Sequence, residues 1–236
     1  MGVEKGVSGR LYGIGVGPGD PELITLKAVR ILGEVPVIAY PAPDRGHGAA
    51  RAIAANFIPQ GRMEIAIRVP MRPGEVPVEA YDRAADEIAV HLQAGLDVGV
   101  LCEGDPFFYG SFMYLHDRLA GRFACTIVPG VTSLTACAAA SGRPLVRRDE
   151  VLNVLPATLS DPELERRLAD GNSAAILKVG RHLPRIRAML AHLGIADRAV
   201  YVAHATRPDE RVALLSDLID DEAPYFSMIL VSKAHP

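Results

Sequence analysis

An apolar run at residues 98–101 breaks abruptly into a loop with two carboxylates, two glycines and a Pro–aromatic pair. The run reads Val-Gly-Val-Leu and is typical of a strand that a parallel sheet buries on both faces. The loop at residues 103–110 reads Glu-Gly-Asp-Pro-Phe-Phe-Tyr-Gly, and its glycines permit backbone conformations and close approaches that other residues prevent. Because ligands of open α/β sheets bind beyond the carboxyl ends of the strands, we expect a bound molecule at this loop.

The same pattern occurs twice more in the first half of the chain. Residues 11–16 run into Gly17-Pro18-Gly19-Asp20, and residues 124–128 run into Pro-Gly-Val-Thr-Ser at 129–133. Each is a strand-like segment, then a Gly/Pro turn, then a polar residue suited to a helix start. Three such turns predict three loops at one edge of a parallel sheet.

Strand-like and helix-like segments alternate along the whole chain, which predicts an α/β fold. A helix is expected from Asp20, with Asp20 as its N-cap and Pro21 in its first turn, as far as Gly33. In the second half, the strands expected at residues 211–214 and 226–231 have no full helix between them. The second sheet is therefore expected to be mixed.

The composition excludes several classes of protein. A formal net charge of −3 indicates no nucleic-acid binding, and no apolar run approaches the roughly 20 residues of a membrane span. The seven histidines form no HxxxH or HExxH pair, so no metal site is expected. Three cysteines without CxxC spacing indicate a reducing, cytoplasmic setting.

Other interpretations of the first glycine run fail in detail. A G-x-G-x-x-G dinucleotide motif would need glycine at Pro18 or at Asp20, and no Gly-Lys-Ser/Thr of a P-loop follows. Two interpretations stay open: a tight turn before a capped helix, and a direct cofactor contact at Pro18.

The carboxylates Glu103 and Asp105 also allow two interpretations. They could work as an acid–base pair or bind a cofactor, or Asp105 could cap a turn while Glu103 is merely solvated. Thr132 and Ser133 are likewise either a helix N-cap or cofactor contacts.

Taken together, GPGD at residues 17–20, GDPFFYG at 104–110 and PGVTS at 129–133 resemble the tetrapyrrole methylases. These are the S-adenosylmethionine-dependent enzymes of the cobalamin and sirohaem pathways, and the resemblance covers nearly the whole chain. It implies two α/β domains, residues 1–133 and 134–236, with a cofactor cleft between them. It also implies a homodimer that binds S-adenosyl-L-methionine and an anionic tetrapyrrole.

The resemblance further implies which residues bind the cofactor. These are Pro18, Glu103, Gly104, Asp105, Phe108, Thr132, Ser133, Val179, Ala205 and Thr206. A carboxylate among them could accept hydrogen bonds from the cofactor's ammonium or ribose hydroxyls. Carboxylate groups of a tetrapyrrole would need cationic partners, and the candidates in loops are Arg45, His47, Arg51, Arg68, Arg72, Arg147, Arg148 and Arg207.

Within the family, the Tyr-Pro-Ala-Pro at residues 40–43 and the closing residues 225–231 are most similar to the enzymes that methylate C20 of precorrin-2. Uroporphyrinogen methyltransferases carry an aspartate proton acceptor where this chain has Pro41, which leaves the catalytic base unassigned. The expected reaction is C20 methylation of precorrin-2 to precorrin-3A in cobalamin biosynthesis. The alternatives are methylation of cobalt-factor II or uroporphyrinogen III, a nicotinamide-dependent oxidoreductase, and a noncatalytic tetrapyrrole carrier.

Overall fold

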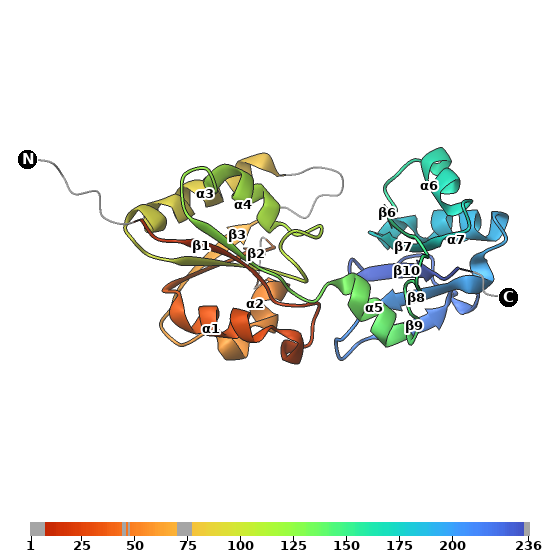
Figure 1. Ribbon diagram of the computed structural model, residues 1–236, viewed down its shortest axis with the longest axis horizontal. Coiled ribbons are helices and arrows are strands. Elements are labelled where there is room, and N and C mark those ends of the chain that lie inside the picture. Colours follow the sequence, from red (N-terminus) through yellow and green to blue (C-terminus); the bar gives the residue numbers. More distant parts are fainter. Residues whose placement is uncertain (1–7, 44–45, 47, 70–76, 234–236) are drawn as a thin grey trace, which may run out of the picture. The chain divides into compact units, whose positions relative to one another are not determined.

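The chain folds into two compact α/β units, which span Met1–Thr132 and Ser133–Pro236 (Figure 1). The computed structural model describes residues 8–43, 46, 48–69 and 77–233. The expected domain boundary after Ser133 lies one residue beyond this division. The α/β class is the one that the alternation of segments predicts, and two α/β units are what the family resemblance implies.

Unit 1 holds a sheet of five parallel strands in the order β3-β2-β4-β1-β5. The strands are β1 (Leu11–Gly15), β2 (Val37–Ala42), β3 (Met63–Arg68), β4 (Val98–Cys102) and β5 (Cys125–Val128). In register, Gly15 of β1 lies beside Cys102 of β4, and Ile14 lies beside Val128 of β5. The loops that follow β1, β4 and β5 therefore leave the sheet at one edge, as the three Gly/Pro turns predict.

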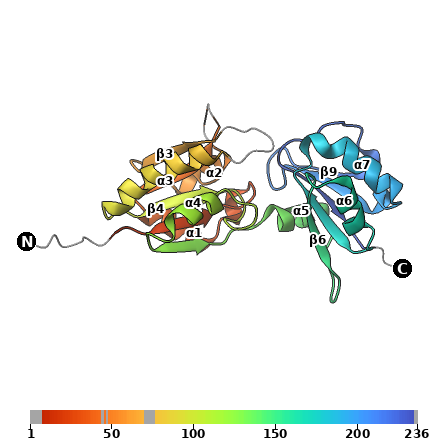
Figure 2. The ribbon, with the colours of Figure 1, turned by 90° about the horizontal axis from the view of Figure 1, so that it is seen from above.

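Helices cover both faces of this sheet. Helices α3 (Val78–Gln93) and α4 (Phe112–Leu119) pack on one face, and Figure 2 looks down on that side. Helices α1 (Leu26–Glu34) and α2 (Ala49–Ile53) pack on the other. In α3, Tyr81, Ala85, Ile88 and Leu92 recur at helical spacing and are all buried, so one face of the helix joins the core.

The prediction of one helix from Asp20 to Gly33 is wrong. Asp20 Oδ1 accepts a hydrogen bond from the Glu22 N–H (2.8 Å), but the turn it caps is a 3₁₀ helix of three residues, Pro21–Leu23. Ile24 is extended, and Thr25 Oγ1 then caps α1 by accepting from the Ala28 N–H (3.2 Å). The helix continues through Gly33 and ends at Glu34, because Val35 precedes a proline and takes extended backbone.

Unit 2 holds a mixed sheet in the order β6-β7-β10-β8-β9, which confirms the prediction from its last two strands. The strands are β6 (Leu152–Pro156), β7 (Ser173–Leu177), β8 (Ala199–Ala203), β9 (Arg211–Leu214) and β10 (Ser227–Val231). β6 and β7 are parallel, whereas β10 runs antiparallel to β7 and β8, and β9 antiparallel to β8. Helices α6 (Asp161–Leu168) and α7 (Leu183–His192) share a core with this sheet, and α5 (Ser133–Ser141) contacts β8 and β10.

All three cysteines are free thiols; Cys102 and Cys137 are buried, and Cys125 is partly exposed. The cysteines therefore add no covalent cross-link to either unit.

In the described ranges, no helix combines the length and apolar character needed to cross a membrane.

Candidate functional site

The loops after β1 and β4 are joined backbone to backbone at the carboxyl edge of unit 1. Gly104 donates its N–H to the Gly17 oxygen (2.8 Å), and Gly17 donates to the Gly104 oxygen (3.3 Å), which forms an isolated antiparallel bridge. Their φ angles of +77° at Gly17 and +65° at Gly104 lie in the region that only glycine adopts without strain. The bridge therefore requires glycine at both ends.

The loop after β5 packs against the same bridge. A Cβ added to Gly130 would lie 2.1 Å from the Gly104 oxygen, and one added to Gly15 would lie 2.6 Å from the Gly130 nitrogen. Backbone atoms occupy both positions, so neither glycine can carry a side chain without moving a loop. The glycines of these loops thus allow one loop to pack directly on another. The sequence did not predict this packing role for Gly15 or Gly130.

Asp105 ties the β4 loop to the β5 loop. Its Oδ1 accepts from the Phe107 N–H (2.8 Å), and its Oδ2 accepts from the Gly130 N–H (3.0 Å). The first bond is the turn cap that was one of the two open interpretations of Asp105, while the second reaches 25 residues along the chain. Each carboxylate oxygen has a further lone pair, so the proposed cofactor contact and these bonds are compatible.

Glu103 is bonded within the protein, not merely solvated. Its Oε1 accepts from the Ala50 N–H (3.0 Å) at the start of α2, so the side chain caps a helix that lies 53 residues earlier. Glu103 and Asp105 therefore reach different loops. This arrangement argues against their use as a paired acid and base.

The other predicted residues of the first half lie beside these loops. Pro18 is buried directly after the bridged Gly17. Phe108 is partly buried, and its ring meets that of Tyr109 edge-on with centroids 5.2 Å apart. Thr132 and Ser133 stand on either side of the division between the units, and Ser133 is the first residue of α5.

In unit 2, the predicted residues Val179, Ala205 and Thr206 follow the carboxyl ends of β7 and β8. The amino end of β10 lies between those ends, because Leu177 pairs with Met228 and Ala203 with Ser227. Val179 and Ala205 are buried and Thr206 is partly exposed. The three residues are thus brought to one edge of the unit 2 sheet.

The backbone at this edge is strained. Lys178, His204 and Thr206 have φ angles of +57°, +51° and +68°, and a β-branched residue such as Thr206 rarely adopts this region. The Thr206 N–H donates to Glu210 Oε2 (2.6 Å), and the His204 N–H donates to the Phe226 oxygen (2.8 Å). Strain of this kind clusters at functional sites, which accords with the residues predicted there.

Two of the arginines proposed for substrate carboxylates have partners within unit 1. Arg51 lies on α2 and forms a two-pronged ion pair with Glu64 (2.8 and 2.9 Å). Arg68 ends β3 and donates to the oxygens of Pro43 and Gly46 (2.6 and 2.9 Å). Both hold neighbouring segments together, and the expectation that they lie in loops is wrong, because Arg51 is in α2 and Arg68 in β3.

The remaining candidate cations are dispersed. Arg147 and Arg148 line a hollow of about 550 Å³ with Asp149, Glu150 and Lys233. Lys233 donates its N–H to Ser173 Oγ at the amino end of β7, so this hollow lies at the opposite edge of the sheet from Thr206. The Arg207 guanidinium stacks 4.0 Å from the Phe226 ring, near the predicted edge. Arg45, His47 and Arg72 lie outside the described residues.

The position that carries an aspartate in uroporphyrinogen methyltransferases is Pro41 of β2, and no carboxylate replaces it there. The preceding Tyr40 is buried and hydrogen-bonded to Glu64. Burial first, and then the bond to Glu64, raises the pKa of the Tyr40 hydroxyl. A phenol held protonated in this way does not serve as a proton acceptor, so the catalytic base stays unassigned.

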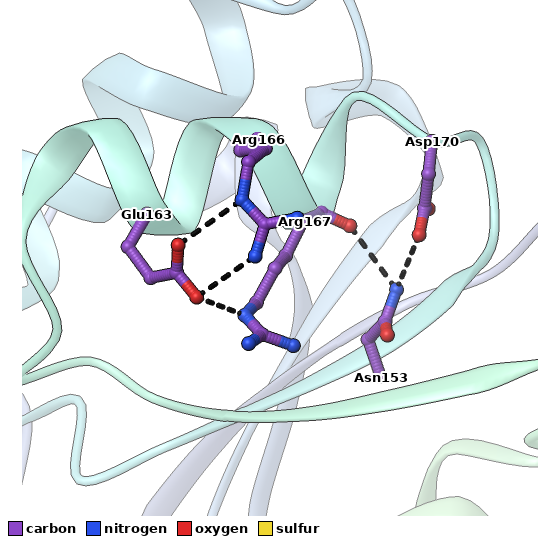
Figure 3. Close-up of polar contacts among 5 residues, drawn as sticks. All are labelled: Asn153, Glu163, Arg166, Arg167 and Asp170. Carbon is purple, nitrogen blue, oxygen red and sulfur yellow. Dashed lines mark hydrogen bonds and ion pairs between the residues drawn. The ribbon is translucent and has the colours of Figure 1, made fainter.

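Among the described residues, the carboxyl group of Glu163 has a strongly lowered pKa. Hydrogen bonds from Arg166 and then Arg167 lower the pKa of Glu163 on α6 to about 2, and Figure 3 shows both guanidinium groups on its carboxylate. The nearby Asn153 amide donates to Asp170 Oδ2 (2.9 Å) and to the Arg167 oxygen (3.1 Å). The Glu163 contacts lie at helical spacing, and those of Asn153 join β6 to the end of α6. Both stabilise the local structure of unit 2 and indicate no site.

Within the ranges that the structure describes, His, Cys, Asp and Glu side chains form no group of three that could hold a metal ion. The polar groups at the two edges are amides, carboxylates and hydroxyls, with Lys178, His204 and Arg207 at the edge of unit 2. Such groups can hydrogen-bond an organic ligand.

The sequence and the fold of this chain are similar to those of known proteins. A sequence model of the Tetrapyrrole (Corrin/Porphyrin) Methylases matches residues 10–218. The precorrin-2 C(20)-methyltransferase of Sinorhizobium sp is 46% identical over 94% of this chain and 95% of its own, and the cobalt-precorrin-2 C(20)-methyltransferase of Salmonella typhimurium is 32% identical over 96% and 98%. Among solved structures, the Thermus thermophilus uroporphyrin-III C-methyl transferase in complex with S-adenyl homocysteine matches with a TM-score of 0.68, 27% identity and coverage of 94% and 97%. The chain therefore belongs to the tetrapyrrole methylase family, as its three loop motifs indicate.

Proposed function

We propose that this protein transfers a methyl group from S-adenosyl-L-methionine to C20 of precorrin-2, giving precorrin-3A in cobalamin biosynthesis. The observation that carries the proposal is the 46% identity to the Sinorhizobium sp precorrin-2 C(20)-methyltransferase along almost the full length of both chains. The cobalt-precorrin-2 relative is also full-length but only 32% identical, which favours the metal-free substrate.

The residues at the carboxyl edges fit such a cofactor. Its ammonium and ribose hydroxyls donate hydrogen bonds, and Asp105 offers carboxylate oxygens with lone pairs to spare. The solved Thermus thermophilus relative binds S-adenyl homocysteine. The proposed cofactor contacts are Pro18, Glu103, Gly104, Asp105, Phe108, Thr132 and Ser133 in the first half, and Val179, Ala205 and Thr206 in the second.

When bound, the cofactor supplies a methyl group that its sulfonium already activates. The protein's part is therefore to bind and orient the two reactants, and orientation lowers such barriers by roughly 7–11 kcal/mol. Pro41 offers no proton acceptor, so the proton lost from the macrocycle goes to water or to a carboxylate outside the residues named here.

A homodimer and a cytoplasmic location complete the proposal. The family resemblance supports the dimer, and three free thiols support a reducing compartment. Light scattering of the purified protein tests the dimer, which a mass of one 25.2 kDa chain would contradict.

The reaction is tested by incubating the protein with methyl-labelled S-adenosylmethionine and, in turn, precorrin-2, cobalt-precorrin-2 and uroporphyrinogen III. We expect product from precorrin-2, with NMR locating the label on the C20 meso carbon. Label only on a pyrrole-ring carbon would mean a different methylase of the family. Binding without turnover would favour a tetrapyrrole carrier.

Calorimetry distinguishes a methyltransferase from the remaining alternative, a nicotinamide-dependent oxidoreductase. We expect binding of S-adenosylhomocysteine and none of NADH. Tight NADH binding without an S-adenosylhomocysteine signal would overturn the methyltransferase assignment in favour of an oxidoreductase.

A further inference from the structure

We infer that Glu103, Gly104 and Asp105 form a clasp that sets the neighbouring loops of unit 1 before any ligand binds, so that the two carboxylates position these loops in addition to their proposed contacts with the cofactor. The structural part of this inference stands on the bonds within unit 1. Its consequence for cofactor binding rests on the proposed function.

Each residue of the clasp bonds to a different segment of unit 1. Glu103 accepts from the Ala50 amide, where the chain returns from β2 into α2. Gly104 bridges Gly17 after β1, and Asp105 accepts from the Gly130 amide after β5. In the strand order β3-β2-β4-β1-β5, a single tripeptide after β4 thus holds the segments that follow three other strands.

The backbone of the tripeptide makes this division possible. Residues two apart in extended chain point to the same face, but Gly104 has a φ of +65° and turns the chain between the carboxylates. Its carbonyl oxygen then lies against Gly15 and Gly130, where Cβ atoms would come within 2.7 and 2.1 Å of it. The three loops are therefore held by polar bonds and also have no room to shift.

The chemistry of the Asp105 side chain gives a sharp test. Both of its oxygens accept from backbone N–H groups, whereas an asparagine has one oxygen and one NH₂ group. Asp105→Asn can keep the bond to Phe107 but would then turn a donor toward the Gly130 N–H. The bond to Phe107 is local, two residues along the chain, so we expect the single amide oxygen to stay there and the link to the Gly130 loop to be lost while the size of the side chain is kept.

The first experiment measures amide hydrogen exchange at Gly130 by NMR in the ligand-free protein. We expect wild-type Gly130 to be protected and Asp105→Asn to exchange at least tenfold faster. The matched control is Asp97→Asn, because Asp97 Oδ1 accepts from the Arg10 N–H (2.7 Å) and so ties the segments before β4 and β1 together. The control should leave Gly130 unchanged. Unprotected Gly130 in the wild type, or equal exchange in Asp105→Asn, would overturn the clasp.

The second experiment asks whether Glu103 acts through Ala50 or through its charge on the ligand. Glu103→Gln retains an oxygen that can accept from the Ala50 N–H, while Glu103→Ala retains none. A positioning role predicts that S-adenosylhomocysteine binds Glu103→Gln within about twofold of the wild type and Glu103→Ala about tenfold more weakly. A direct contact with the cofactor's ammonium predicts equal losses in both variants, which would overturn the positioning role.

Failure of the clasp and failure of the proposed function have different signatures. Exchange at Gly130 is measured without any ligand, so it reports on the clasp whatever the protein binds. Protection at Gly130 in a wild-type protein that binds no S-adenosylhomocysteine would remove the proposed function and leave the clasp in place.

Discussion

Left-handed backbone occurs at the carboxyl edge of unit 1 and at the corresponding edge of unit 2, but different residue types adopt it in the two units. In unit 1, the left-handed positions at the bridge are Gly17 and Gly104. In unit 2, the left-handed positions include Lys178, His204 and Thr206, which carry side chains and are strained in this region. The bridge of unit 1 relies on glycines, which adopt the conformation freely, and Tyr109 (φ +55°) is the left-handed non-glycine residue later in the β4 loop. The edge of unit 2 relies on three side-chain-bearing residues that must be held in this conformation.

The difference shows in what restrains each edge. Gly15 and Gly130 pack against the backbone of neighbouring loops, including the Gly104 oxygen, so a side-chain atom added at either residue must displace a loop. Thr206 is held by a hydrogen bond from its amide to Glu210, and His204 by one to Phe226. Unit 1 should therefore be intolerant of added bulk at its glycines, whereas unit 2 should store strain that a substitution can release.

The largest expected effect is the loss of stability in Gly130→Ala. Its Cβ would lie 2.1 Å from the Gly104 oxygen, and overpacking of this kind costs about 3 kcal/mol. The control is Gly33→Ala, because nothing lies within 4 Å of that Cβ and the residue is in α1, so stability should rise by roughly 0.5–1 kcal/mol.

Urea unfolding followed by circular dichroism measures both variants, since the chain has no tryptophan to report by fluorescence. Equal stability of Gly130→Ala and wild type would mean that the loops of unit 1 can yield, and the contrast between the two edges would then disappear.

A smaller effect of opposite sign is expected for Thr206→Gly. Left-handed backbone at this residue costs about 1–3 kcal/mol, and the added freedom of an unfolded glycine costs roughly 0.5–1 kcal/mol, so a net gain of about 1 kcal/mol is expected. Thr126→Gly in β5 is the control and should lose stability, because strand backbone stores no such strain. The same unfolding experiment compares them, and a loss in Thr206→Gly as large as in Thr126→Gly would show that unit 2 holds no releasable strain.

The smallest effect concerns Glu163, which lies outside both edges (Figure 3). Its folded pKa is lowered from 4.5 to about 2, so the stability it contributes is complete above pH 4.5 and is lost as the pH falls toward 2. Glu163→Gln should therefore be slightly less stable than wild type at pH 6, with the difference fading near pH 2. The effect is small because the pair is exposed to solvent.

NMR titration of the Glu163 carboxyl checks this prediction directly. A midpoint at the ordinary glutamate value of 4.5 would mean that Arg166 and Arg167 do not hold the carboxylate.

The sequence alone determined the features that depend on local chemistry. Three apolar runs that each end in a Gly/Pro turn predicted the loops at one edge of a parallel sheet, and the missing helix before residues 226–231 predicted the mixed sheet. The same turns identified the family, because backbone that must turn or approach closely restricts the residue type strongly. The end of the first helix is also determined locally, because Val35 precedes Pro36 and takes extended backbone. The prediction that the helix stops at Gly33 did not take this pair into account.

Only the tertiary structure decided which groups those loops bring together. The bond from Ala50 to Glu103 spans 53 residues and that from Gly130 to Asp105 spans 25, and no local pattern specifies either partner. The same holds at Thr206, whose left-handed backbone is accompanied by a bond from its amide to Glu210, and the residue type of Thr206 does not predict that conformation. Local sequence limits the conformations that a loop can adopt, whereas long-range packing and hydrogen bonding select one of them and set the partner of each carboxylate.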